Sequence, residues 1–209
     1  MTRRNSRGFS LLELMVTLSF ALIMAGVTFL TLMPMFNKSH VDSAYATTLE
    51  VMRDTRNLAI AQSHEYLVVF APQGAGGAPA TLTVQYQPPA SLGVVPPVQL
   101  VNTYSLPLDV NFQVKAGFPA NTPDNYGTGI TAIDFGYGPN QATGGNTIVF
   151  GPDGGSYDTL GDYNGGVVYL TQTSDPTVYS SRAVTVFGAT GRIRGWRLYN
   201  QGGATWVQQ

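Results

Sequence analysis

One carboxylate, Glu13, lies inside a long apolar stretch that runs from Phe9 to Met33. An ionised carboxylate in hydrocarbon costs at least about 2.5–3.5 kcal/mol, so it must find a counter-charge or stay protonated. No basic side chain lies within helical reach on its C-terminal side. If the chain were cut after Gly8, the new α-amino group of Phe9 would lie one helical turn from Glu13. These residues therefore predict cleavage between Gly8 and Phe9.

A second group of residues that could bind a ligand is a cluster of arginines near the C-terminus. It holds half of the eight Lys and Arg residues that follow residue 8, namely Arg182, Arg192, Arg194 and Arg197. Strand alternation would place Arg192, Arg194 and Trp196 on one face, where two guanidiniums beside an indole suit phosphate contact and base stacking. Arg192, Arg194, Trp196 and Arg197 are therefore candidate DNA-binding residues. The alternative is structural, because basic residues on edge strands prevent sheets from associating.

Residues that could bind a metal are few and scattered. Asp153, Asp158 and Asp162 lie in one loop and could offer oxygen ligands to calcium, but their spacing fits no twelve-residue helix-loop-helix pattern, so turn formation is favoured. His40 and His64 have no other ligands at metal-binding spacing, and the chain has no cysteine. We expect no metal and no cofactor, with calcium binding by the loop 153–162 left open.

Catalytic motifs are also missing from the sequence. It contains no G-x-S-x-G, Walker A, H-E-x-x-H or G-x-G-x-x-G pattern. The lack of cysteine excludes thiol catalysis, and two isolated histidines leave few means of activating another nucleophile. The sequence therefore predicts a protein that is not an enzyme.

The apolar stretch that contains Glu13 is long enough to span a membrane, since about 20 apolar helical residues suffice. Arg3, Arg4 and Arg7 precede it without an acidic residue, so the positive-inside rule predicts a cytoplasmic N-terminus. An ordinary secretory signal is disfavoured, because Glu13 interrupts the apolar run and the A-x-A pattern at 44–46 lies too far along the chain. A generic signal-anchor helix remains the alternative.

The composition favours one β-rich domain after this anchor. The chain has 209 residues, 44% of them hydrophobic, which is enough for a packed core. With 24 Gly, 13 Pro and only 11% charged residues, short strands and turns are expected. Removal of residues 1–8 would leave eight basic against 12 acidic residues, so contact with nucleic acid would require a local basic cluster.

Residues 37–63 are predicted to form an amphipathic helix. Its apolar face would hold Val41, Tyr45, Leu49, Met52 and Ala59. The charged residues of this segment lie mostly elsewhere and are expected to serve only solvation: Glu50, Arg53, Asp54 and Arg56. Between the two helical segments, Pro34 could kink the helix or end its first part.

Runs rich in β-branched and aromatic residues, separated by Gly and Pro signals, predict antiparallel strands in the rest of the chain. The predicted strands are 66–70, 81–86, 98–104, 110–114, 131–137, 147–150, 167–170, 182–187 and 192–199, with a hairpin turn at 188–191 and a long loop at 118–129. The fold class is α+β, with a long N-terminal helix packed on an antiparallel two-sheet β domain. The expected boundaries are a leader at 1–8, a helix at 9–63 whose anchor covers about 9–33, and the β domain at 64–209.

The segment Gly8-Phe9-Ser10-Leu11-Leu12-Glu13-Leu14 resembles the prepilin signature of type IV pilins and type II secretion pseudopilins. This resemblance implies a pilin-like fold, cleavage after Gly8 by a prepilin peptidase, and N-methylation of Phe9. It also implies that Glu13 neutralises the N-terminus of a neighbouring pilin subunit during assembly. Many major pilins have a helix-breaking proline where this chain has Leu30, so the resemblance departs at that position.

A second resemblance covers three later segments. TIVFGPDGGSYD at 147–158, VVYL at 167–170 and SRAVTVFGATGRIRGW at 181–196 are similar to the C-terminal half of GspH/FimT-like minor pseudopilins. This implies a single-pass subunit of the bacterial inner membrane, with its domain in the periplasm, that assembles into a type II secretion pseudopilus or a type IV pilus.

The same resemblance offers an alternative function. Some FimT-like minor pilins of natural transformation bind DNA through a C-terminal GRxR motif, which Gly191-Arg192-Ile193-Arg194 matches. It therefore leaves DNA uptake open beside protein secretion and pilus assembly.

Overall fold

The computed structural model describes residues 10–91, 95–119, 121–127, 129–137, 145–158 and 160–209, without the side chains of residues 31 and 33–38. The predicted cleavage residues Gly8 and Phe9 lie outside the described residues. The chain divides into two compact units, Met1–Lys38 and Ser39–Gln209. Helix α1, Leu11–Gln62, contributes to both units, which are described separately below.

Helix α1 is continuous through Pro34, so the prediction that this proline could end the first helical segment is wrong. In the second unit, the predicted apolar face is confirmed. Val41, Tyr45, Met52 and Ala59 are buried, and the partly buried Leu49 packs against them. Helical residues three or four positions apart lie on one face, so apolar residues at this spacing could be recognised in the sequence.

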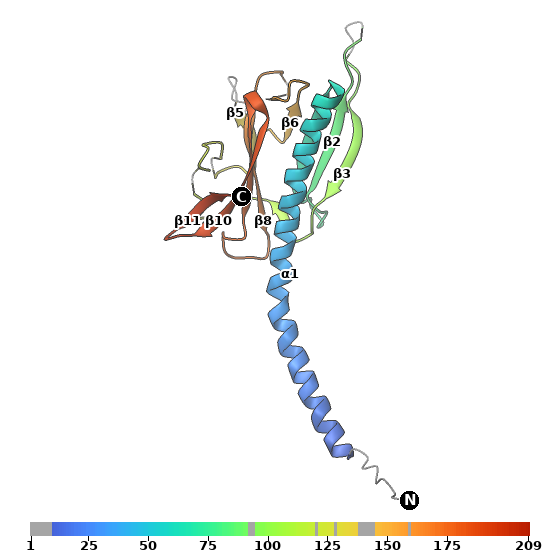
Figure 1. The fold of residues 1–209 in the computed structure, drawn as a ribbon, viewed down its shortest axis with the longest axis vertical. Coiled ribbons are helices and arrows are strands. Elements are labelled where there is room, and N and C mark those ends of the chain that lie inside the picture. The colour runs from blue at the N-terminus through green and yellow to red at the C-terminus, as the bar shows by residue number, and fades with distance from the viewer. Residues whose placement is uncertain (1–9, 92–94, 120, 128, 138–144, 159) are drawn as a thin grey trace, which may run out of the picture. The chain divides into compact units, whose positions relative to one another are not determined.

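The first sheet of the β domain has five antiparallel strands in the order β3-β2-β1-β6-β7 (Figure 1). Its strands are β1 Glu65–Ala71, β2 Thr81–Gln87, β3 Gln99–Ser105, β6 Thr147–Phe150 and β7 Ser156–Tyr157. β3 forms one edge, and six of its seven residues are exposed. No charged residue occurs between Glu65 and Asp109, so this edge carries no charge of its own.

The second sheet has six strands in the order β11-β10-β9-β8-β4, with β5 also paired to β8. Its strands are β4 Val110–Phe112, β5 Ile133–Tyr137, β8 Gly165–Gln172, β9 Arg182–Phe187, β10 Arg192–Asn200 and β11 Ala204–Gln208. A short 3-10 helix, η1 Gly188–Thr190, joins β9 to β10 and ends at Gly191, whose φ of 57° is in the left-handed region. Glycine reaches this conformation without the strain of a side chain.

The main core lies between the second half of α1 and both sheets. It combines apolar residues from the helix with residues from β1, β2, β6, β8 and β9. Phe70 of β1 links the sheets directly, because its ring centroid lies 5.6 Å from Phe112 of β4 and 5.2 Å from Phe135 of β5. A second cluster, which includes Tyr169, Trp196 and Trp206, packs against other residues of the six-stranded sheet. The α+β fold with two antiparallel sheets is therefore confirmed.

Most predicted strands are present with small shifts at their ends. The predicted ranges 147–150 and 182–187 match β6 and β9. The sequence analysis did not identify β7 or the C-terminal strand β11. β11 pairs with residues 196–200 of β10, so only residues 192–195 of β10 remain without a second strand beside them.

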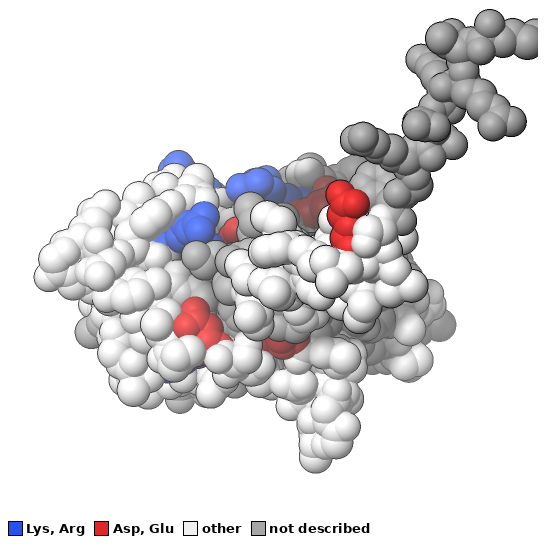
Figure 2. All heavy atoms as spheres, turned by 90° about the horizontal axis from the view of Figure 1, so that it is seen from below, with Lys and Arg blue, Asp and Glu red and all other residues white. Residues whose placement is uncertain are grey.

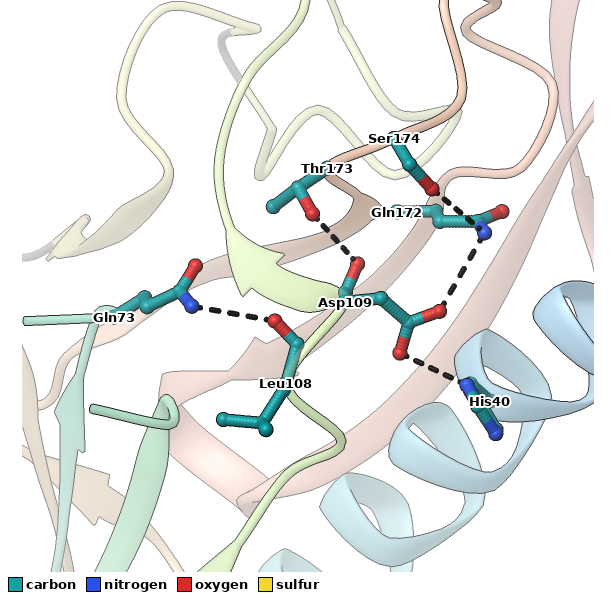
Figure 3. A network of polar contacts seen from close by, with 7 residues as sticks. All are labelled: His40, Gln73, Leu108, Asp109, Gln172, Thr173 and Ser174. Carbon is teal, nitrogen blue, oxygen red and sulfur yellow. Dashed lines mark hydrogen bonds and ion pairs between the residues drawn. The ribbon is translucent and has the colours of Figure 1, made fainter. Parts of the chain in front are cut away.

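A polar network fastens the start of the second unit's helix to the six-stranded sheet (Figure 3). The Nδ1 atom of His40 lies 2.9 Å from Oδ1 of Asp109, next to β4. Gln172 of β8 donates to Oδ2 of Asp109 at 3.5 Å, and the hydroxyl of Thr173 donates to its main-chain oxygen at 3.1 Å. These partners give His40 a structural role.

Candidate functional site

The N-terminal part of α1 is long and apolar enough to cross a membrane. From Leu11 to Leu30 its mean hydropathy is 2.0, and every side chain in this range is exposed. An exposed apolar surface of this length is unfavourable in water and requires lipid or a protein partner. Length and composition therefore fit a membrane-anchored protein.

Glu13 lies in the first turn of α1 and is exposed. Among the described residues it has no ion pair. Ser10 accepts a hydrogen bond from the amide of Leu12 at 3.3 Å, which satisfies one of the free donors at the helix start. A carboxylate in the first turn also interacts favourably with the helix dipole. Glu13 is thus available to a positive charge from outside this segment.

A concave feature of the second unit, lined by four arginines, is referred to here as the basic groove. Its volume is about 1460 Å³. Residues from α1, the loop after residue 123, Tyr163, the β9–β10 turn and β10 line it, including Arg53, Arg56, Asp124, Tyr126, Phe187, Arg192 and Arg194. Half of the eight Lys and Arg residues that follow residue 8 therefore line one groove.

This grouping contrasts with the rest of the protein, because only 11% of the residues are charged. On the face drawn in Figure 2, Lys, Arg, Asp and Glu occupy few places on a largely uncharged surface. From the sequence, Arg53 and Arg56 are expected only to serve solvation. The fold instead brings them beside Arg192 and Arg194, more than a hundred residues further along the chain.

Arg56 links two turns beside the basic groove. Its Nε donates to the carbonyl of Gly154 at 2.9 Å, and its Nη2 donates to the carbonyl of Thr190 at 3.0 Å. A Cβ atom at Gly191 would lie 2.1 Å from the oxygen of Gly154 and 2.9 Å from Nε of Arg56. Gly191 thus permits the close approach of three segments, and Arg56 has a structural role.

The other three arginines of the groove are not engaged in this way. The side chains of Arg53, Arg192 and Arg194 make no hydrogen bond or ion pair within the described part of the chain. Arg53 and Arg192 are exposed, whereas Arg194 is half-buried and its Nε atom is buried without a hydrogen-bond partner. A buried donor without a partner is costly, so the fold gains no stability from this Nε atom, and only the exposed part of the Arg194 side chain is open to a ligand.

Asp124 is the one acidic residue among those lining the groove. Its Oδ1 accepts the hydroxyl of Thr122 at 2.7 Å, and its Oδ2 accepts the hydroxyl of Thr185 at 2.6 Å. The carboxylate is therefore held by neutral donors, and its single charge stands against four arginines. The groove has a net positive charge.

Aromatic rings lie among these charges. Phe187 is 43% exposed and Tyr163 is 47% exposed. Tyr126 meets Phe187 edge-on, with ring centroids 5.7 Å apart. Burial raises the pKa of the Tyr126 hydroxyl, and the nearby carboxylate of Asp124 raises it further. The tyrosine therefore stays neutral, and the groove presents flat apolar surfaces beside cations.

The stacking role predicted for Trp196 is wrong in this structure. Alternation does place it on the face of Arg192 and Arg194, but it is only 4% exposed, within the second apolar cluster. Its indole N–H donates to the hydroxyl of Thr185 at 2.9 Å. Loop residues that include Phe118 cover this face, and sequence alternation could not reveal that cover.

Arg197 and Arg182 also lie apart from the basic groove. The guanidinium of Arg197 is 5.4 Å from the centroid of Tyr199, a cation–π contact. Arg182 is buried and donates to Oδ1 of Asp42 at 2.6 Å and 3.1 Å. Burial lowers the pKa of Arg182, and the Asp42 carboxylate opposes this shift. The predicted arginine cluster is thus divided between the groove and structural contacts.

Two of the three aspartates in the loop 153–162, Asp153 and Asp158, hold this loop by hydrogen bonds. Asp153 accepts hydrogen bonds from the hydroxyls of Tyr157 at 2.6 Å and Tyr163 at 3.1 Å, and the rings of these tyrosines stack. Asp158 accepts the amide protons of Leu160 at 2.8 Å and Asp162 at 3.0 Å. In the described ranges, no three His, Cys, Asp or Glu side chains are grouped so as to hold a metal ion.

Comparison with known proteins gives one match. Residues 3–29 match the family model described as the prokaryotic N-terminal methylation motif. No curated protein and no solved structure matches the chain. The match covers the apolar stretch and the residues before it, and it supports a type IV pilin-like prepilin signal there.

Proposed function

Starting from this N-terminal methylation motif, we propose that the protein is a minor pilin or pseudopilin subunit. A prepilin peptidase cleaves it between Gly8 and Phe9 and methylates Phe9, and the subunit then assembles into a type II secretion pseudopilus or a type IV pilus. The observation that carries this proposal is the match of residues 3–29 to the N-terminal methylation motif. The same segment forms an exposed apolar helix that contains a single carboxylate, Glu13. The subunit acts by assembly and is not an enzyme.

The proposed topology follows from charge. Arg3, Arg4 and Arg7 stay in the cytoplasm, the anchor at about 9–33 crosses the bacterial inner membrane once, and the β domain at 64–209 is extracytoplasmic. In the membrane, Glu13 pairs with the methylated amino group of a neighbouring subunit's Phe9. This pairing removes the cost of an isolated carboxylate in hydrocarbon and favours association.

Processing is tested by mass spectrometry of the protein purified from membranes of a strain that has the peptidase. The mature chain should begin with N-methylated Phe9. A bulky replacement such as Gly8→Leu should block cleavage, whereas Gly26→Ala should not, because a Cβ atom at Gly26 meets no atom within 4 Å. A mature chain that retains Arg7 would contradict the proposal.

Assembly is tested separately with Glu13→Val, which should insert and be cleaved normally because it only removes a charge from an apolar helix. Cross-linking of the variant to neighbouring subunits should fall strongly. Glu50→Val, which changes an exposed carboxylate of the second unit, serves as the matched control. Cross-linking of Glu13→Val at the wild-type level would remove the role assigned to this carboxylate.

A second candidate function is the binding of DNA during uptake, which the basic groove favours. Arg192 and Arg194 of the GRxR segment are unpaired and lie beside Arg53, so three cations can meet phosphates together. Protection of a sheet edge is still an explanation for Arg192 and Arg194, since β11 does not pair with this part of β10. It does not account for Arg53, which lies on the helix.

This candidate is tested with the full processed chain in detergent micelles. It should retard DNA at low salt, and the affinity should fall steeply as salt rises. Arg192→Gln with Arg194→Gln should abolish retardation, while Arg197→Gln should not, because Arg197 lies outside the groove. If the double variant still retards DNA as the wild type does, these arginines do not bind DNA. If it also aggregates, they protect the unpaired edge of β10.

A further inference from the structure

The basic groove combines two kinds of surface that recognise different parts of one ligand. Unpaired guanidiniums come from both sides, with Arg53 on α1 and Arg192 and Arg194 on β10. Two exposed aromatic rings line the same groove, those of Phe187 and Tyr163. A ligand that fills this groove must carry repeated negative charges and flat apolar groups.

We propose that the basic groove binds an extended single strand of nucleic acid, with phosphates on Arg53, Arg192 and Arg194 and a base stacked on Phe187. The proposal rests on the second candidate function above and defines its ligand. Positive grooves with aromatic platforms are the usual means by which proteins hold single strands without sequence preference. Arg53 and Phe187 become contact residues that the sequence had not indicated.

The position of the groups favours a single strand over a duplex. Arg194 is half-buried, and a single strand is narrow enough to follow the groove to the exposed part of its side chain. The bases of a duplex are already paired and stacked, so they cannot meet Phe187. A duplex could offer its phosphates only to the exposed arginines, Arg53 and Arg192.

The dimensions favour a polymer over a small ligand. The volume of about 1460 Å³ exceeds the range of roughly 300–1,000 Å³ that is usual for small-molecule pockets. A polymer of acidic residues alone would satisfy the arginines but would offer no aromatic ring to Phe187. The rings therefore decide between these two polyanions.

The test measures fluorescence anisotropy of a labelled deoxythymidine oligonucleotide and of a duplex of equal length, each titrated with the full processed chain in detergent micelles. The single strand should bind at least about tenfold more tightly at equal salt. Poly-glutamate should displace it poorly. Equal affinity for both nucleic acids, or efficient displacement by poly-glutamate, would overturn the inference.

Two variants probe the proposed contacts. Phe187→Leu keeps an apolar side chain but removes the ring, and it should weaken single-strand binding at least about fivefold, since stacking on an aromatic ring is worth that much or more per base. Tyr179→Leu is the matched control, because this exposed tyrosine lies outside the groove. An equal effect of both variants, or none from Phe187→Leu, contradicts the stacking contact.

Arg53→Gln changes an exposed helix residue and does not depend on the fold tolerating Phe187→Leu. It should reduce the slope of log affinity against log salt by about 0.7, the value for one lost phosphate contact on a single strand. Arg197→Gln should leave the slope unchanged, and an equal change in both would overturn the contact. Failure to bind either nucleic acid would also refute the second candidate function, whereas the processing and assembly of the subunit are measured independently.

Discussion

The contact between α1 and the β9–β10 hairpin has two ends with opposite properties. At one end, Arg182 is buried against Asp42, and Tyr45 packs on Gly195 with no room for a Cβ atom. At the other end, the same two elements separate around the basic groove, where Arg53, Arg192 and Arg194 have no partner in the described structure. The closed end stabilises the fold, whereas the open end keeps charges that the fold does not use.

The largest effect is expected from Gly195→Ala at the closed end. The new Cβ atom would lie 1.8 Å from the hydroxyl oxygen of Tyr45 and 2.7 Å from its Cζ atom. We expect a loss of about 3 kcal/mol in the free energy of unfolding, measured by denaturant titration in detergent. Tyr45→Phe removes a buried hydroxyl that has no partner. Gly195→Ala should therefore cost less stability in the Tyr45→Phe variant than in the wild-type protein. Equal costs in both backgrounds would show that the helix does not pack on Gly195 as described.

Asp42→Ala should have the next largest effect, about 2 kcal/mol, because it leaves the buried guanidinium of Arg182 without its carboxylate. The side chain of Asp42 is 48% exposed, so water compensates for part of the loss. Asp54→Ala, an exposed carboxylate on the same helix, is the control and should change stability little. A similar small change for both variants would contradict the importance of this pair.

Arg56→Met tests the boundary between the two ends. It removes the hydrogen bonds to the carbonyls of Gly154 and Thr190 while keeping an apolar stem, and it should cost about 1–2 kcal/mol. Hydrogen exchange should increase in the turns at 151–155 and 188–191 before the rest of the sheet. If exchange rises equally throughout the domain, Arg56 is not a local clamp.

The smallest effect concerns Asp153, next to the open end. The hydrogen bond from Tyr157 holds the pKa of Asp153 below its ordinary value. Because the folded pKa is the lower one, the contact stabilises the fold above about pH 4 and is lost as the pH falls through the folded value. Asp153→Asn should remove this part of the acid dependence of unfolding and change stability at pH 7 by less than about 1 kcal/mol, since the group is exposed. Identical pH profiles for both proteins would exclude the contact.

The closed end was partly predictable, and the open end was not. The spacing of Val41, Tyr45 and Met52 showed which face of the helix is buried, because that periodicity is local. The alternation of residues 182–187 likewise defined a strand to the residue. The basic groove depends instead on contacts between residues more than a hundred positions apart, for which one sequence carries no local signal.

Two features beside β10 also lacked a local signal in the sequence. β11 is a short strand that follows Gly202-Gly203, and its five residues have too little alternation to be recognised in isolation. The cover over Trp196 comes from a loop around Phe118, which has no periodicity at all. The glycines of the GRIRG segment carried a signal that could have been used: Gly195 marks a close approach of another element, and here that element is the helix.

The pairing of α1 with β9 and β10 also sets the order in which the chain can complete its fold. Asp42 and Arg182 are partners 140 residues apart, so the strands that cover this part of the helix are synthesised long after it. Until they arrive, Val41, Met52 and their neighbours on the helix lack part of their apolar cover. The helix therefore reaches its full packing only after β9 and β10 have been made.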